Sequence, residues 1–197
     1  EANQLASFYP GAMSEARDIE LLPVVERVGH PDLVIIGPTD PDGMLRHTDE
    51  CRQRGYPFAA DPSQQLARMD GAEIRQLIDG ATYLFTNEYE AALTEQKTGW
   101  TAAEILDRVE CRITTLGDKG ALYRDRTRSV HVPVISAGPV VETTGAGDAF
   151  NGGFAVALSE GRDVIEAVRF GCATAGISVT RPGTAPAMPA RAEIEAL

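Results

Sequence analysis

Short apolar runs alternate along the chain with longer stretches in which apolar and polar positions recur at helical spacing. The runs predict four buried strands, "DLVIIG" (32–37), "PFAAD" (57–61), "TYLFTN" (82–87) and "RITTLG" (112–117). The stretches between and after them predict helices at 41–54, 70–79, 88–97 and 101–109. Such alternation with tight links is typical of an α/β fold in which helices cover a mostly parallel sheet.

The pattern changes after Gly120. The segments "ALYRD" and "SVHVPV" are short, close together and alternating, which predicts a β-hairpin. Two further helices are predicted, at 147–160 and 163–180, before a turn rich in Pro and Gly. No internal repeat, low-complexity segment or linker is visible, so we expect a single domain over residues 1–197.

Composition narrows the class of protein. The 197 residues are 43% hydrophobic, as expected of a folded globular chain. Against 18 Lys and Arg stand 29 Asp and Glu, a net charge of −11, which argues against nucleic acid as a partner. No apolar run is long enough to span a bilayer and no signal peptide is visible, so we expect a cytoplasmic protein. The three cysteines lack C-x-x-C spacing, so we expect buried free thiols.

The stretch "ETTGAGDAFNGGF" (142–154) carries the main candidate chemistry. Gly145 and Gly147 allow a sharp turn, and the first N–H groups of the helix that follows have no helical partner, so this region predicts an anion pocket. Asp148 in the first turn would repel a bound anion, but it suits a base that takes a proton from an attacking hydroxyl. The alternative is an ordinary helix start with a first-turn acid.

Two further segments have both a functional and a purely structural interpretation. Asn87 ends a predicted strand and Glu90 lies three residues on, which suits a hydrated magnesium ion or a plain capping box. In "TTLGDKG", Thr115, Gly117 and Gly120 either approach a nucleotide phosphate or form only the turn between two strands.

In this order, N-x-x-E, T-x-G-x-x-G and "TTGAGDAFNGGF" resemble the ribokinase-like (PfkB-type) family of sugar and nucleoside kinases. The resemblance covers nearly the whole chain and implies a three-layer α/β sandwich that transfers the γ-phosphoryl group of ATP, with magnesium, to a hydroxymethyl group. It implies Asp148 as catalytic base, with an anion hole at Gly145, Ala146 and Gly147. Asn87 and Glu90 would act on magnesium through water, and nucleotide contacts are implied at Thr115, Gly117 and Gly120.

The resemblance also implies a potassium site, because many members bind a monovalent cation beside the anion hole. Its matching positions here are Glu142, Thr144, Arg181 and Gly183. The first half of the chain resembles bacterial adenosine kinases, in which an aromatic matching Phe8 lies against the purine, with a core or lid phenylalanine as the alternative. From about residue 111 the chain is more similar to ribokinase.

The resemblance further implies that strands and most of a lid precede Glu1 in the family, so the chain is expected to lack its N-terminal portion. An adenosine-like nucleoside is the expected acceptor, with ribose or another sugar as the alternative. An incomplete sheet would expose apolar surface and recruit a second copy of the chain or a separate N-terminal chain. The remaining alternative is a fragment or assembled chain that binds nucleotide without turnover.

Overall fold

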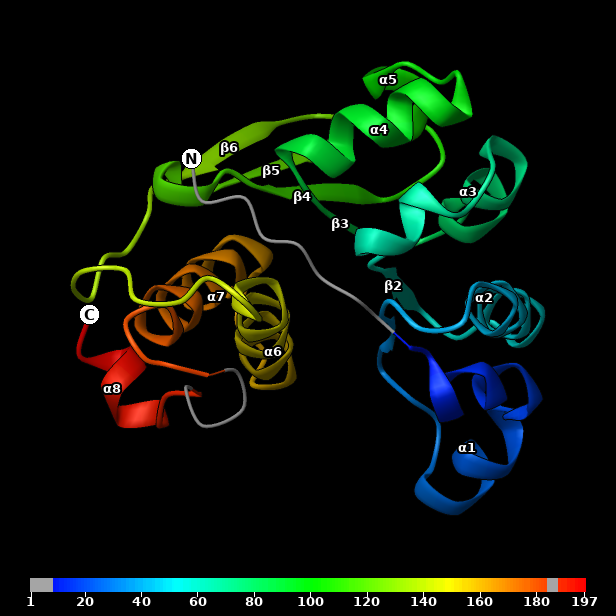
Figure 1. Ribbon diagram of the computed structural model, residues 1–197, viewed down its shortest axis with the longest axis horizontal. Coiled ribbons are helices and arrows are strands. Elements are labelled where there is room, and N and C mark those ends of the chain that lie inside the picture. Colours follow the sequence, from blue (N-terminus) through cyan, green and yellow to red (C-terminus); the bar gives the residue numbers. More distant parts are fainter. Residues whose placement is uncertain (1–8, 184–187) are drawn as a thin grey trace. The chain divides into compact units, whose positions relative to one another are not determined.

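The computed structural model describes residues 9–183 and 188–197 (Figure 1). Within these residues the strands follow the predicted positions: β1 (Val34–Ile36), β2 (Phe58–Ala60), β3 (Tyr83–Asn87), β4 (Cys111–Thr115), β5 (Ala121–Asp125) and β6 (Ser129–Val132). The α-helices are α1 (Leu22–Val28), α2 (Pro41–Arg54), α3 (Gly71–Ile78), α4 (Glu88–Thr98), α5 (Ala102–Leu106), α6 (Ala146–Ser159), α7 (Val164–Ser178) and α8 (Arg191–Glu195). Three 3₁₀ turns are η1 (Gly11–Asp18), η2 (Ser63–Ala67) and η3 (Gly117–Lys119).

The strands pair in chain order, and the sheet is mixed. β1 pairs with β2 and β2 with β3 in parallel, as the strand–helix alternation predicts. β5 and β6 are antiparallel, which confirms the predicted hairpin. The antiparallel pairing also includes β4, where Thr115 lies opposite Ala121. Because only residues 116–120 separate Thr115 from its partner Ala121, the chain reverses in a tight turn rather than through a crossover helix.

The chain forms two compact units. Unit 1 comprises Glu1–Leu84 and Ala92–Glu110, and unit 2 comprises Phe85–Ala91 and Cys111–Leu197. The single-domain organisation expected from the sequence stays a prediction.

The core of unit 1 lies between its parallel strands and helices α2, α3 and α5. Its fully buried side chains include Phe58, Met44, Leu66, Ile74, Leu77, Leu84 and Ile105. Capping boxes begin two of these helices: Asp70 with Glu73 for α3, and Thr101 with Glu104 for α5. Each box satisfies N–H groups that have no partner in the first turn, so both helix ends are closed by side chains.

Unit 2 is built around the close pair α6 and α7, drawn from yellow to orange in Figure 1. A side chain at Gly153 of α6 would clash with the Thr174 hydroxyl on α7, and one at Gly171 of α7 would lie 2.8 Å from the Phe150 carbonyl oxygen. Glycine at both places lets the two backbones approach. α7 in turn contacts β5 and β6. Helix α6, which carries the candidate anion pocket, is therefore held in place by its close packing against α7.

Some short helices were not predicted from the sequence, whereas the state of the cysteines was. The apolar pattern did not predict η1, α1, η2 or α8, of which α8 has five residues. The cysteines Cys51, Cys111 and Cys172 are free and buried, as expected. Burial raises the pKa of Cys51 and of Cys172 to about 11 in each case. In the part of the chain that the structure describes, no helix is long and apolar enough to cross a membrane.

Candidate functional site

The N-terminus of α6 is shaped by Gly145, which adopts a left-handed conformation with φ +80° and ψ 5°. A residue with a side chain rarely adopts this conformation, so glycine sets the direction in which the helix starts. The Ala146 N–H donates to the Thr143 carbonyl oxygen at 3.2 Å. Among the described residues, the N–H groups of Gly147 and Asp148 have no acceptor, and no side chain caps this helix end. The helix therefore begins with two available donors at its positive dipole end.

Gly147 and Asp148 both face solvent in the first turn of α6. A Cβ at Gly147 would meet no atom within 4 Å, so the packing of the protein does not require glycine there. Because glycine has no Cβ, a ligand can approach the backbone closely at this position. The exposed Asp148 carboxylate stands next to these donors, which is the arrangement that the sequence interpretation of a base beside an anion pocket requires.

Three aromatic rings hold this end of α6 in place. Phe150 and Phe154 stack with ring centroids 6.4 Å apart, and both meet Phe85 of β3 edge-on, at 6.2 Å and 5.2 Å. All three rings are buried. Edge-on aromatic pairs add a directional contribution to the area that they bury. The first turn of α6 is consequently fixed relative to the strand that ends at Asn87.

A cavity of about 600 Å³ lies within unit 2 beside the start of α6. It brings together five of the predicted site residues: Thr115, Gly117, Gly120, Ala146 and Gly147. Its remaining wall is mainly apolar, from Val134, Ile135, Val140, Phe150, Cys172, Ala175, Gly176 and Val179. Ligand pockets typically measure about 300–1,000 Å³ and are mostly apolar with a few polar groups, so this cavity has the size and character of a small-molecule site.

The loop after β4 is both a structural turn and a wall of this cavity. Gly117 and Gly120 have φ of +59° and +99°. A side chain at Gly120 would overlap the main chain at Val132 and Pro133, so only glycine fits there. The Leu116 N–H donates to the Gly120 carbonyl oxygen at 2.7 Å, which closes the turn. The two interpretations of "TTLGDKG" are therefore compatible, since the turn residues also line the cavity.

Asn87 and Glu90 form a reciprocal capping box at the start of α4. The Asn87 N–H donates to Glu90 Oε2 and the Glu90 N–H donates to Asn87 Oδ1, both at 2.8 Å. Partial burial raises the pKa of Glu90. Over the described ranges, no group of three or more His, Cys, Asp or Glu side chains could hold a metal ion. The structure therefore shows the capping box that the sequence offered as an alternative, and the magnesium role of Asn87 and Glu90 stays a prediction.

The four predicted potassium positions fall into two groups. The Glu142 carboxylate accepts from the Thr144 hydroxyl at 2.7 Å and from its N–H at 3.1 Å, and the Thr144 hydroxyl lowers the pKa of Glu142 most. The Glu142 N–H donates to the Val179 carbonyl oxygen at 3.1 Å. That contact fastens the approach to α6 onto the end of α7. Arg181 follows this end, and its side chain pairs with Glu193 rather than with Glu142.

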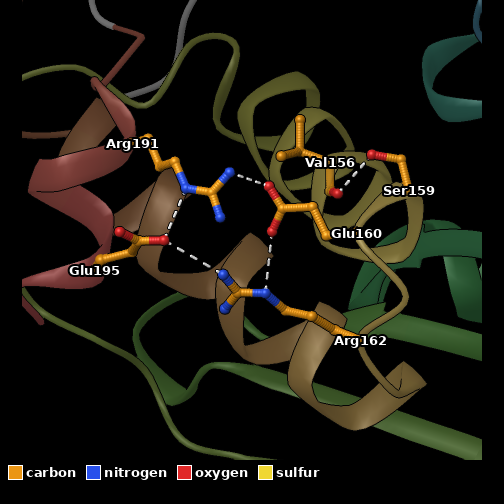
Figure 2. A network of polar contacts seen from close by, with 6 residues as sticks. All are labelled: Val156, Ser159, Glu160, Arg162, Arg191 and Glu195. Atoms are coloured by element: carbon orange, nitrogen blue, oxygen red, sulfur yellow. Dashed lines mark hydrogen bonds and ion pairs between the residues drawn. The ribbon is translucent and has the colours of Figure 1, made fainter.

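Helix α8 is fixed to the rest of unit 2 by ion pairs, drawn in Figure 2. Arg191 contacts Glu160 at the end of α6 and Glu195 within α8, the latter at 2.8 Å. Arg162 contacts Glu160 at 3.2 Å and Glu195 at 3.4 Å. Most of these groups are exposed, so the pairs orient α8 more than they stabilise it. Two further predicted site residues remain to be placed. Gly183, the fourth predicted potassium position, has a φ of +82°. Phe8, the predicted purine contact, lies outside the described residues.

Sequence reasoning missed the apolar wall of the cavity. One signal was present: "GCATAG" (171–176) places small residues and two glycines inside a helix, where glycine is disfavoured by about 1 kcal/mol. In the structure a side chain at Gly176 would clash with the Ile135 carbonyl oxygen. The loop after β6 therefore lies directly on α7, and the cavity forms beside this close contact.

Comparison with known proteins gives the following likenesses. Residues 1–191 match the pfkB family of carbohydrate kinases. A nucleoside kinase of Burkholderia thailandensis, solved in complex with ADP-inosine, is 38% identical with a TM-score of 0.90 over 98% of this chain and 60% of its own. Ribokinase of Bacillus subtilis is 32% identical over 95% of this chain and 62% of its own length. A nucleoside kinase of Methanocaldococcus jannaschii is 29% identical over 80% and 52%. The chain thus spans less than two thirds of the length of each.

Proposed function

The chain belongs to the pfkB family of carbohydrate kinases, and on that premise we propose that it transfers the γ-phosphoryl group of ATP to the hydroxymethyl oxygen of a nucleoside or sugar. One observation carries the proposal: the N–H groups of Gly147 and Asp148 have no acceptor among the described residues, beside a cavity of about 600 Å³. Phosphoryl transfer needs positioning and stabilisation of negative charge more than covalent help from the protein. Available amides at a helix N-terminus supply that stabilisation.

In the proposed mechanism, Asp148 accepts the proton of the acceptor hydroxyl as the hydroxyl oxygen forms the new bond to the γ-phosphorus. The bond between that phosphorus and the bridging oxygen breaks, and ADP leaves with the bridging oxygen. The N–H groups of Gly147 and Asp148 hold the charge that develops on the transferred group, with the dipole of α6 behind them. Gly145 contributes by its left-handed conformation, which aims the helix start. Ala146 contributes little as a donor in this mechanism, because its N–H already donates to Thr143.

The donor nucleotide lies, in this proposal, in the cavity of unit 2. Thr115, Gly117 and Gly120 contact it along the loop after β4, and the apolar residues of α7 enclose its base. Asn87 and Glu90 would hold the water shell of magnesium, which would supply positive charge against the phosphates. Potassium would bind near Glu142, Thr144, Arg181 and Gly183. The Glu142 carboxylate, ionised and turned to Thr144, supplies charge of the right sign there.

The acceptor proposed first is a purine nucleoside, with Phe8 against the base and ribose as the second candidate. The support is the likeness to a nucleoside kinase solved with ADP-inosine, together with the resemblance of the first half of the chain to adenosine kinases. Ribokinase of Bacillus subtilis is also a relative, so a free sugar is the competing acceptor.

Two measurements, made one after the other, test the proposed function. Calorimetry with ATP and magnesium measures donor binding, and a phosphorylation assay with adenosine, inosine and ribose then measures transfer. The proposal predicts that ATP binds through the Gly145–Asp148 loop and that its γ-phosphoryl group is transferred to at least one of the three acceptors. Binding without transfer to any acceptor would instead support the alternative that the chain binds nucleotide without turnover. No ATP binding would contradict both.

A further inference from the structure

A second hollow, lined by arginine and tryptophan, lies wholly within unit 1. It has a volume of about 280 Å³ and is lined by Arg52, Arg75, Gln76, Asp79, Trp100 and Arg108. These residues come from the end of α2, from α3 and from the two flanks of α5. We call it the arginine hollow. In a chain with net charge −11, three basic side chains gather here around one acidic side chain that lines the same space.

Arg52 builds one wall of the arginine hollow. Its Nη1 donates to the Gln76 and Asp79 carbonyl oxygens at 2.7 Å and 2.8 Å, at the end of α3. Its Nη2 donates to Asp49 Oδ1 at 2.5 Å, and the Gln76 amide donates to the other oxygen of Asp49 at 2.8 Å. Both oxygens of Asp49 are thereby engaged, so this carboxylate is held away from the remaining arginines.

Arg75 and Arg108 keep donors for a ligand. Arg75 donates through Nε to the Gly71 carbonyl oxygen at 3.0 Å, and its two Nη groups have no acceptor among the residues described. Arg108 Nη1 lies 3.7 Å from Asp79 Oδ1, beyond hydrogen-bond distance. Both side chains are exposed, but each is oriented by the ring of Trp100, with guanidinium carbons 5.7 Å and 5.1 Å from the ring centroid. Stacking on an aromatic ring restricts the guanidinium plane before any ligand binds.

Trp100 provides a fixed support for these two arginines. Its ring is partly buried and packs against the core of unit 1. Its backbone N–H donates to the Thr98 hydroxyl at 3.2 Å, which holds the residue between α4 and α5. Within the described part of the chain the indole N–H has no acceptor, so it is a further donor at this place. It is also the one tryptophan in the sequence.

We propose that the arginine hollow binds the phosphate group of a small phosphorylated metabolite. Guanidinium groups bind phosphate oxygens through paired hydrogen bonds, and Arg75 and Arg108 present two such groups across one rigid ring. The volume falls just below the usual range for ligand pockets, about 300–1,000 Å³, so the organic part of the ligand is small. The competing explanation is that both arginines serve only to cover Trp100, in which case phosphate leaves the site unchanged. The proposal does not depend on the phosphotransferase function, because none of the residues proposed for that function lines this hollow.

The test uses the fluorescence of Trp100, because a single tryptophan reports on this site alone. The protein is titrated at constant ionic strength with inorganic phosphate, ribose 5-phosphate and, as an uncharged control, ribose. We expect a saturable change with both phosphate probes and none with ribose. Equal Kd values for the two would identify the free oxyanion as sufficient, and tighter binding of ribose 5-phosphate would identify the phosphorylated metabolite. Calorimetry under the same conditions checks that the optical change reports binding.

Variants separate binding from packing. Arg75→Gln and Arg108→Gln each remove one charged donor group and should raise the Kd about tenfold. Arg169→Gln is the matched control, since it removes the same charge from an exposed arginine of unit 2 and should leave the Kd unchanged. Thermal unfolding shows whether each variant is folded. The proposal is overturned if neither phosphate probe binds up to about 10 mM, or if Arg75→Gln and Arg108→Gln bind phosphate as tightly as the parent.

Discussion

The starts of helices α6 and α7 differ although the two helices pack against each other in the same unit. At α7, the Asp163 side chain accepts from the N–H groups of Ile165 and Glu166 at 2.8 Å and 3.1 Å. At α6, Gly145 offers no side chain and the corresponding donors have no acceptor among the described residues. A side-chain cap contributes about 1 kcal/mol to stability. The capped end of α7 therefore serves folding, and the uncapped end of α6 forgoes that stabilisation.

The same contrast holds for the surroundings of the two helix starts. Ala146 and Gly147 line the cavity of about 600 Å³, whereas no residue of the first turn of α7 does. α3, α4 and α5 also begin with side-chain caps, so the means of closing a helix are used repeatedly in this chain. The difference teaches that the two glycines have separate reasons: Gly145 gives the helix start its left-handed conformation, whereas Gly147 is not required by packing and fits the proposed phosphate contact.

The largest expected effect follows from an Asp to Asn change at each helix start. Asp148→Asn removes the proposed base and should lower kcat by about 10²- to 10⁴-fold while ATP affinity stays close to that of the parent. Asp163→Asn is the matched control, because asparagine caps a helix as well as aspartate does. Steady-state kinetics and calorimetry measure both. An Asp148→Asn enzyme with a tenth of the parent activity would rule out the base.

Gly147→Val tests whether the available amides bind phosphate. The position has room for a side chain in the protein alone, so we expect normal folding but ATP binding weakened by about tenfold or more, as when one N–H contact to a charged group is lost. Gly152→Val, on the same helix, also has an unobstructed Cβ position and should bind ATP normally. Calorimetry compares the two. Equal ATP affinity in both variants would mean that the Gly147 region is only a turn.

Asp163→Ala tests the capped side of the comparison. Loss of the side chain leaves the Ile165 and Glu166 N–H groups without their acceptor and should lower the free energy of unfolding by about 1 kcal/mol. Denaturant unfolding measures this change. ATP affinity should not change, because the α7 start takes no part in the proposed site. If a folded Asp163→Ala variant bound ATP more weakly than the parent, the start of α7 would take part in nucleotide binding, and the assignment of that helix start to folding alone would be wrong.

The smallest expected effect concerns Glu142, on the approach to α6. Hydrogen bonds from Thr144 lower its pKa below the usual value of 4.5, so the ionised carboxylate stabilises the loop. This stabilisation is present above pH 4.5 and is lost as the pH falls through the lowered pKa. Thr144→Val should move the pKa back toward 4.5, and Thr143→Val, which changes no side chain bonded to Glu142, should not. An NMR titration of the Glu142 carboxyl carbon measures this, and equal values in parent and Thr144→Val would refute it.

Much of the fold could be predicted because local pattern and tertiary packing agree. β1 is β-branched throughout and β2 and β3 are mostly apolar, while α2, α3 and α5 carry explicit start signals at Asp40, Asp70 and Thr101. The family and its α/β fold, implied by the glycine motif, are confirmed by the comparisons. The likeness of the two halves to different branches stays a prediction. Helix α8 was missed because it has five residues and depends on ion pairs to Glu160 and Arg162 that no local pattern encodes.

The candidate site could be predicted only in part. The sequence singles out the glycine loop and Asp148 because two glycines and an acid stand at a predicted helix start. The structure adds that Gly145 has a positive φ and that packing does not require glycine at Gly147. The pairing of Ala146 with Thr143, and the capping box between Asn87 and Glu90, depend on backbone geometry that the sequence leaves open. The apolar wall from α7 and the loop after β6 arises from contacts between distant segments, so no local pattern could identify it.

The most direct test of the central claim is an amide NMR titration with magnesium and a non-hydrolysable ATP analogue. The account predicts that the Gly147 and Asp148 amide resonances shift on binding, while those of Ile165 and Glu166, already bonded to Asp163, stay in place. If calorimetry shows that the analogue binds and the Gly147 and Asp148 amides do not move, the uncapped end of α6 does not hold phosphate and the account is wrong.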